Sequence, residues 1–86
     1  MVKDIFKQMV LNHLKRGNFL FRKHALIRMQ ERGVTKDDII SVGHSCHSIE
    51  WQDKHQSYLV NGDDSDSLPL SIACIYEDGT IIVTVF

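Results

Sequence analysis

The sequence predicts an α+β domain with two or three N-terminal helices packed on one face of an antiparallel sheet of about four strands. Helical periodicity fills the first half of the chain, and strand-like segments separated by turn residues fill the second half. An Asp78-Gly79 pair between the last two segments is a strong hairpin signal. With 86 residues, 43% of them hydrophobic, the chain suits one core, so a single domain is expected over residues 1–86.

The first expected element is a helix over Val2–Arg16. Apolar residues recur there at helical spacing, whereas Lys3, Lys7 and Lys15 face elsewhere. Gly17-Asn18 ends this segment, so residues 1–17 form an added N-terminal helix. The expected stripe comprises Val2, Ile5, Phe6, Met9, Val10, His13 and Leu14. His13 is interpreted as a packed or boundary residue of this stripe.

Two further helices are expected before the sheet. Phe19–Phe21 is a short apolar lead into the second helix, which should end at Gly33 because glycine suits a left-handed cap. The third helix begins at Thr35, whose hydroxyl can cap the first turn, with Asp38 as its capping-box partner. The buried side of this third helix should contain Ile39, Ile40 and Val42.

Strands are expected after Gly43. Ser48–Trp51 and Ser57–Val60 are the first two candidates, and the composition of residues 61–69, NGDDSDSLP, predicts a loop. Pro69 marks where the third strand can start. Leu70–Tyr76 and Thr80–Phe86 then flank Asp78-Gly79 as a hairpin.

If Asp78-Gly79 is the whole hairpin loop, Cys74 pairs with Val83, and Ala73 pairs with Thr84. Side chains alternate across a strand, so the two faces can be assigned. The core face, covered by the helices, would hold Ile72, Cys74, Tyr76, Ile81, Val83 and Val85. The other face, a mixed surface that could form a shallow binding groove, would hold Ser71, Ala73, Ile75, Ile82, Thr84 and Phe86.

Composition narrows the function classes. The chain has no apolar run of about 18 residues for a membrane span, and its charged start lacks an apolar signal core. Cys46 and Cys74 are too few for a disulfide framework, so free thiols and a cytoplasmic location are expected. The net charge of -1 lacks the basic excess common in nucleic-acid binders. Nine of the ten Lys and Arg residues nevertheless lie at or before Lys36, so the N-terminal half is basic.

The polar face of the second expected helix is the strongest candidate for a functional site in the sequence. His24, Arg28 and Arg32 follow at fourth-residue intervals, and with Glu31 they fall within about a third of the helix circumference. An imidazole suits proton transfer near neutral pH, and paired guanidinium groups suit phosphate oxygens. The pattern is therefore compatible with metal-independent RNA cleavage. A solvated helix face with charge neighbours produces the same pattern.

Three segments together resemble a widespread small bacterial domain of unknown function. They are Phe21–Val34, with its His-Ala, Arg and Glu-Arg-Gly elements, then Ser57–Gly62, and the ending Gly79–Phe86. Members of that group are similar to the RelE-like ribonuclease toxins of toxin-antitoxin pairs. The resemblance implies a RelE-like fold and a metal-independent endoribonuclease without a cofactor. It also implies an RNA substrate and a cognate antitoxin protein as partners.

The resemblance implies catalytic roles for five residues, His24, Arg28, Arg32, Tyr58 and Thr84. His24 would be the general acid or base, and the two arginines would hold phosphate. Tyr58 would stack on a base or donate a proton, and Thr84 would position a phosphate or ribose. Tyr58 and Thr84 are equally compatible with sheet packing. The weak net charge leaves RNA affinity open.

Two other functions stay open. A non-catalytic protein-binding module of the same fold would use the basic helix and the mixed sheet face, and the added helix would contact an antitoxin or form a homodimer. The second alternative is metal sensing through His44, Cys46 and His47, with His55 nearby. A structural zinc site usually needs four ligands in paired short spacings, which this cluster lacks, so no metal site is expected.

Overall fold

The computed structural model describes residues 2–86 and the side chains of residues 5–86. The elements are α1 (Val2–Arg16), β1 (Phe19–Phe21), α2 (Lys23–Arg32), α3 (Lys36–Ser45), β2 (Ser48–Gln52), β3 (Ser57–Asp63), β4 (Pro69–Tyr76) and β5 (Thr80–Val85). The predicted α+β class with N-terminal helices is confirmed. The expected positions of the Val2 and Lys3 side chains on the first helix lie outside the described part of the chain.

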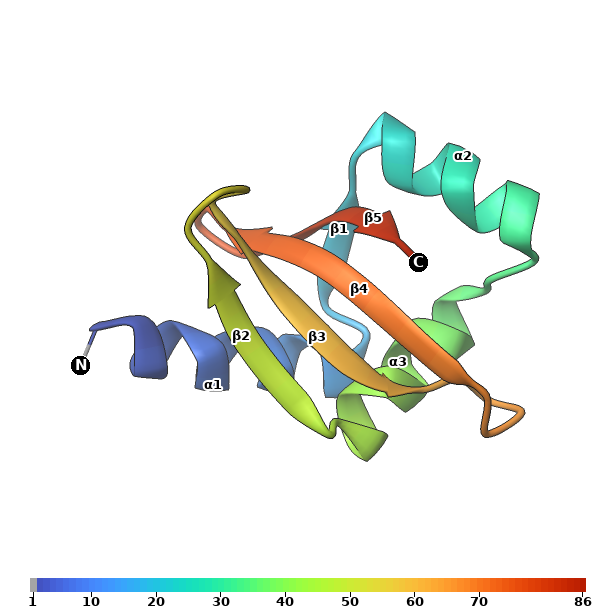
Figure 1. Cartoon of the computed structure of the whole chain (residues 1–86), viewed down its shortest axis with the longest axis horizontal. Helices are drawn as coiled ribbons and strands as arrows, with labels where there is room; N and C mark the ends of the chain where they lie inside the picture. The colour runs from blue at the N-terminus through green and yellow to red at the C-terminus, as the bar shows by residue number, and fades with distance from the viewer. Residues whose placement is uncertain (1) are drawn as a thin grey trace.

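The described strands form one sheet in the order β1-β5-β4-β3-β2 (Figure 1). Neighbours from β5 to β2 are antiparallel, whereas β1 runs parallel to β5, with Phe19 opposite Thr80. The expectation that Phe19–Phe21 is only a lead into a helix is therefore wrong, and the sheet is mixed and five-stranded. Three residues are too few to show strand periodicity, and the pairing is with a strand about sixty residues away in sequence.

α1 and α3 cover one face of this sheet, and Figure 1 looks onto the opposite face, with α2 to one side of the sheet. α1 packs on α3, α3 packs mainly on β3, and α2 packs beside β5. The layer between helices and sheet is apolar, and side chains from both layers are fully buried there: Val10, Leu14, Ile39, Val42, Val60, Ile72, Ile82 and Val85. One face of the sheet is thus the core face, and the other is free for a ligand.

The predicted helix ends are confirmed by their local geometry. Gly33 follows α2 with φ of 67°, and its N–H and that of Val34 bond to the last carbonyls of the helix. At the start of α3, the Asp38 N–H donates to Thr35 Oγ1 at 3.2 Å, and the Thr35 N–H donates to Asp38 Oδ2 at 2.9 Å. This is a complete capping box.

Two glycines allow close approach between elements. α3 continues through Gly43 instead of ending there, and a Cβ on Gly43 would lie 2.9 Å from Leu14 Cβ in α1. A Cβ on Gly62 would lie 2.8 Å from the Val42 carbonyl oxygen. Gly62 belongs to β3, which runs to Asp63, so the predicted loop over residues 61–69 is shorter than expected.

The β4–β5 hairpin departs from the predicted register near its turn. Asp78 and Gly79 both have positive φ, as expected, but the strands close with Tyr76 opposite Thr80. Cys74 therefore pairs with Ile82 and not with Val83. A β-bulge then restores the predicted pairing of Ala73 with Thr84, and Val83 is the extra residue.

The bulge decides which β5 side chains are buried. Ile82 is fully buried in the core, although the predicted register had placed it on the opposite face. Ile81 and Val83, which were expected in the core, are only half-buried. Val85 is fully buried as predicted. The correction follows from the one-residue shift, because such a shift exchanges the two faces of a strand.

Candidate functional site

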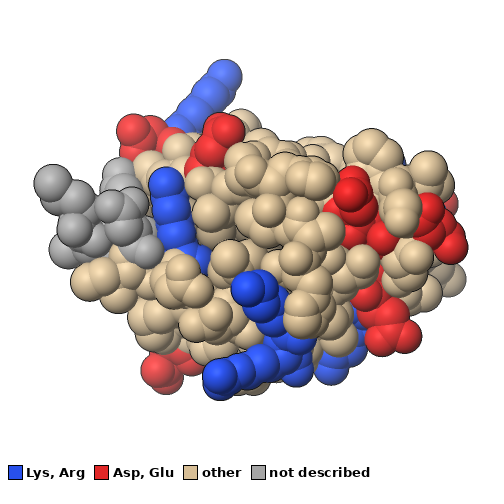
Figure 2. Space-filling model, turned by 90° about the horizontal axis from the view of Figure 1, so that it is seen from below, with Lys and Arg blue, Asp and Glu red and all other residues tan. Residues whose placement is uncertain are grey.

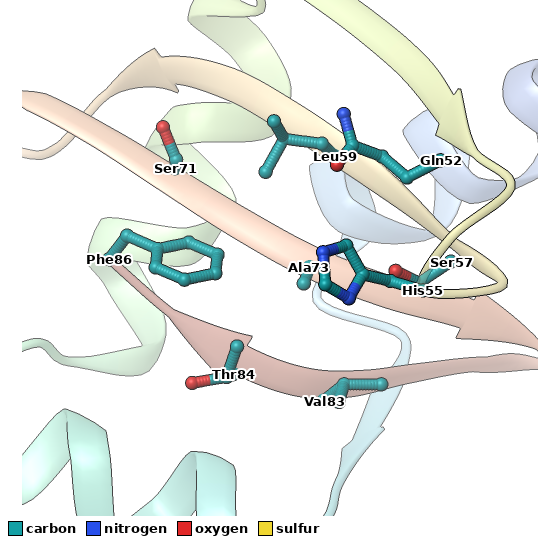
Figure 3. A pocket seen from close by; sticks show the side chains of 9 residues that line it. All are labelled: Gln52, His55, Ser57, Leu59, Ser71, Ala73, Val83, Thr84 and Phe86. Carbon is teal, nitrogen blue, oxygen red and sulfur yellow. The ribbon is translucent and has the colours of Figure 1, made fainter.

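A groove lies on the face of the sheet that α1 and α3 leave uncovered (Figure 3). Its volume is about 490 Å³, within the range of about 300–1,000 Å³ typical of small-ligand sites. The side chains that line it come from the end of β2, the β2–β3 turn, β3, β4, β5 and the residue after β5: Gln52, His55, Ser57, Leu59, Ser71, Ala73, Val83, Thr84 and Phe86. We call this the open-face groove.

Strand alternation explains most of the lining. Ser57 and Leu59 face the groove while the intervening Tyr58 faces the core, and Ser71 and Ala73 follow the same rule in β4. The bulge breaks the rule in β5, so that two consecutive residues face the groove. Four residues predicted for the mixed face are confirmed in the groove: Ser71, Ala73, Thr84 and Phe86.

The groove combines two rings with hydroxyl groups over an apolar floor. In Figure 3 the rings of His55 and Phe86 project into the groove from opposite sides of Ala73. His55 is the one ionisable side chain among the lining residues of this groove. An imidazole next to hydroxyl groups can take and return a proton and can bind polar groups of a ligand.

A short hydrogen-bond chain fixes one polar wall. Ser71 Oγ donates to Asn61 Oδ1 at 2.6 Å, and Asn61 Nδ2 donates to Ser48 Oγ at 2.9 Å. The Ser71 proton is thereby engaged, so the oxygen is left to accept a hydrogen bond from a ligand. This wall is held in place because Asn61 and Ser48 lie on β3 and β2, which are paired with each other.

The structure places Thr84 in the groove and Tyr58 outside it. The Tyr58 ring is 3% exposed in the core, edge-on to the Trp51 ring at 4.9 Å between centroids. A ring in that position packs between sheet and helices and cannot stack on a base. Its position therefore gives no support to the substrate-contacting role expected of Tyr58.

His24, Arg28 and Arg32 lie along α2, away from the lining of the open-face groove. His24 and Arg32 are exposed, Arg28 is half-buried, and Arg28 Nη1 lies 4.0 Å from Glu31 Oε1. A solvent-exposed ion pair at this distance contributes little to the stability of the fold. α2 packs on β5, the strand of Thr84, through its buried residues Ala25 and Met29, so the helix that carries the basic face lies next to β5.

Sequence reasoning missed His55 as a groove residue. It lies in the polar turn between β2 and β3, where alternation gives no direction for a side chain. The folded β2–β3 turn places its ring in the groove that Ala73 also lines (Figure 3). Ser57 had a usable signal, because it shares strand parity with Leu59, two residues further along β3.

Two further histidines, His13 and His47, have structural partners. His13 Nδ1 lies 2.8 Å from Thr80 Oγ1, and the His13 ring stacks on Tyr76. The prediction that His13 is a packed or boundary residue is therefore confirmed. His47 Nε2 lies 3.2 Å from Asp63 Oδ2. Among the side chains that the structure describes, residues 5–86, no three His, Cys, Asp or Glu groups are arranged to hold a metal ion.

A second cavity of about 400 Å³ lies between the end of α1, β1 and the β4–β5 turn, with His13, Tyr76 and Asp78 among its lining residues. His24, Arg28 and Arg32 do not line this cavity either. The three side chains thus share one helix face without converging on either cavity.

Charged side chains are unevenly distributed on the underside of the molecule. Figure 2 shows several Lys and Arg side chains over the middle of this surface and a group of Asp and Glu side chains at the end where Figure 1 places the β3–β4 loop, with further acidic side chains at the opposite end. That loop and the adjoining end of β3 contain Asp63, Asp64 and Asp66. The groove lining has no Lys or Arg, so a polyanion would need the neighbouring helices for its phosphates.

Fold and groove together define a small α+β domain with a ligand-sized site on its open sheet face. Residues 21–86 match the family described as "Domain of unknown function (DUF4258)", and the chain belongs to this family. α1 precedes the matched residues, as the sequence resemblance implied. No curated protein and no solved structure matches the chain. None of the helices within residues 2–86 is long and apolar enough to cross a lipid bilayer.

Proposed function

We propose that this protein is a RelE-like, metal-independent endoribonuclease and the toxin of a toxin-antitoxin pair, with the open-face groove as its RNA site. The observation that carries the proposal is the placement of the His55 imidazole and the Thr84 hydroxyl in one groove of nucleotide size. Family membership over residues 21–86 is compatible with it. The α+β fold with an uncovered sheet face also supports it.

The proposed reaction needs proton transfer and no redox step. His55 takes the proton of a ribose 2′-hydroxyl, and the oxygen attacks the adjacent phosphorus. The bond from phosphorus to the 5′-oxygen breaks, and that oxygen leaves with the proton that His55 had taken, which restores the neutral imidazole. The products are a 2′,3′-cyclic phosphate and a free 5′-hydroxyl. Thr84 would position the ribose or phosphate from the floor of the same groove.

The basic face of α2 has a different part in this proposal. His24, Arg28 and Arg32 lie beyond the groove lining, beside the strand that carries Thr84. They would hold phosphates that flank the cleaved bond, because phosphate contacts position a strand without entering the site. The geometry thus favours His55 over His24 as the proton-transfer group. Tyr58 has no part in the proposal, because its ring is buried in the core.

Cleavage of a labelled single-stranded RNA by purified protein in EDTA tests the proposal. His55→Ala should lower the cleavage rate by about 100-fold, the typical contribution of a general acid–base group. His24→Ala should mainly raise the KM for RNA and should change kcat little, because His24 is proposed to bind flanking phosphates. His44→Ala is the matched control, because His44 is exposed on α3, on the other side of the sheet. Intact RNA after incubation with the folded wild-type protein would refute the nuclease proposal.

The toxin assignment has a separate test in cells. Expression of the wild-type chain without a neighbouring antitoxin gene should stop bacterial growth, and the His55→Ala chain should be tolerated at the same protein level. Unchanged growth with abundant folded wild-type protein would contradict the toxin role. That result would not decide whether the protein cleaves RNA, because the cleavage assay tests this separately.

A non-catalytic protein-binding module is the second candidate. It is favoured by the uncharged lining of the groove next to His55 and by the exposed side chains of Leu20 and Leu26, which are 71% and 51% accessible. Such a module would leave RNA intact and would lose partner binding when the groove is filled.

A further inference from the structure

We propose that the open-face groove holds one unpaired nucleobase stacked on the Phe86 ring, so that the bound strand must be single-stranded at this position. This inference deepens the proposed function and rests on it for the identity of the polymer as RNA. It assigns Phe86 as a substrate-binding residue, a role that neither the sequence reasoning nor the proposed chemistry had given it.

The Phe86 side chain is placed to offer a ring face to a ligand. It is 48% exposed, whereas the other large apolar side chains of the groove lining, Leu59 and Val83, are only half-buried. Figure 3 shows the ring projecting over the groove toward His55, with Ala73 between them. The backbone next to it is held firmly, because the Phe86 N–H donates to the Ser71 carbonyl at 2.8 Å. An aromatic ring that is exposed and anchored is a suitable stacking platform.

The small side chain of Ala73 leaves the space that a base would fill. Ala73 forms the floor between the two rings, and Leu59 extends the apolar floor toward β3. A flat base would rest against Phe86, and its ribose and phosphate would extend toward His55 and Thr84. The volume of about 490 Å³ lies within the range of small-ligand sites, so the groove can hold one nucleotide.

The polar wall is suited to the edge of a base. Because the Ser71 proton is directed to Asn61, the Ser71 oxygen presents lone pairs toward the groove. An N–H group on the edge of a base can donate to that oxygen. In a duplex the same edge is occupied by the complementary base, and both ring faces are covered by neighbours, so a paired base cannot reach Phe86.

Direct binding of an RNA that cannot be cleaved provides the test. The probe is a short 2′-O-methyl oligoribonucleotide with one 2-aminopurine, used as a single strand or annealed to its complement. The wild-type protein should bind the single strand at least about tenfold more tightly than the duplex and should change the 2-aminopurine fluorescence. Phe86→Ala should weaken single-strand binding by about tenfold, whereas Phe86→Trp should retain it.

Two further variants make the result decisive. Phe86→Leu keeps an apolar side chain without the ring face. As the control, Leu68→Ala removes another exposed apolar side chain, 59% accessible, from the β3–β4 loop. Circular dichroism establishes that each variant is folded. Equal binding by wild type and Phe86→Leu would overturn the stacking role, and so would equal affinity for single strand and duplex.

The outcomes separate this inference from the proposed cleavage. Because the probe lacks a free 2′-hydroxyl, binding can be measured whether or not the protein is a nuclease. Phe86-dependent binding with no cleavage of ordinary RNA would support the base site and refute the enzyme. Failure to bind either form of the probe would overturn the base site and favour a protein occupant of the groove.

Discussion

Thr84 of β5 lies opposite Ala73 of β4, one residue further along β5 than an uninterrupted ladder from the turn would place it. The extra residue, Val83, shares the groove side with Thr84, while Ile82 and Val85 remain in the core. The candidate site therefore depends on an irregularity of the sheet, since a regular β5 would have turned one of these two side chains inward.

Filling the floor of the groove should block ligands without unfolding the protein. In Ala73→Leu, the larger side chain would occupy the space between Phe86 and His55. We expect RNA binding and any cleavage to fall by about tenfold or more, with little change in thermal unfolding, because the side chain points out of the core. Ala73→Ser, which preserves the space, is the control. Unchanged binding by the leucine variant would show that the ligand lies elsewhere.

Gly62 should be intolerant of any side chain. The Cβ of Gly62→Ala would lie 2.8 Å from the Val42 carbonyl oxygen, so β3 and α3 would have to separate. Overpacking of this kind typically costs about 1–3 kcal/mol, and urea denaturation should show that loss in the free energy of unfolding. Gln30→Ala, on the exposed side of α2, should change it little. An alanine variant as stable as the wild type would mean that the two elements can move apart freely.

The α3 capping box should make stability depend on pH in acid. The N–H of Thr35, aided by that of Ser65, lowers the pKa of Asp38 from its ordinary value of 3.8, although burial opposes the shift. Because the folded pKa is below the unfolded one, the charged form stabilises the protein fully above the unfolded value. This contribution is lost as the pH falls through the folded pKa.

Asp38→Ala should therefore reduce the free energy of unfolding by about 1 kcal/mol at neutral pH, as expected for a helix cap. Denaturation curves of the variant and wild type should converge below about pH 4. Asp37→Asn, a neighbouring exposed carboxylate outside the box, is the control. A difference that persists unchanged in acid would exclude a charge-dependent contribution.

The two cysteines should react at different rates. Burial raises the pKa of the Cys74 thiol to about 12, and burial also raises the pKa of Cys46, which is only partly covered. Thiolate is the reactive form, so an aromatic disulfide reagent at pH 8 should label Cys46 slowly and Cys74 only after unfolding in urea. Cys46→Ser should remove the native-state signal. Equal rates for both thiols would contradict the burial of Cys74.

The local features of the fold follow from the sequence because each depends on residues close together in the chain. Periodicity places α1 and α2, Gly33 ends α2, and the Thr35–Asp38 capping box starts α3. Alternation in β4 puts Ser71 and Ala73 on the ligand face. Each of these elements could be predicted from a window of a few residues.

Long-range pairing and packing decided the remaining features. The pairing of β1 with β5, the bulge at Val83 and the arrival of His55 over Ala73 each depend on where distant backbone segments meet. Tyr58 was a candidate site residue by sequence. Its ring is in the core because it lies on the face of the sheet that the helices cover. Alternation along a strand shows that its residues fall on two faces. Which face is left open for a ligand is determined by where the helices pack.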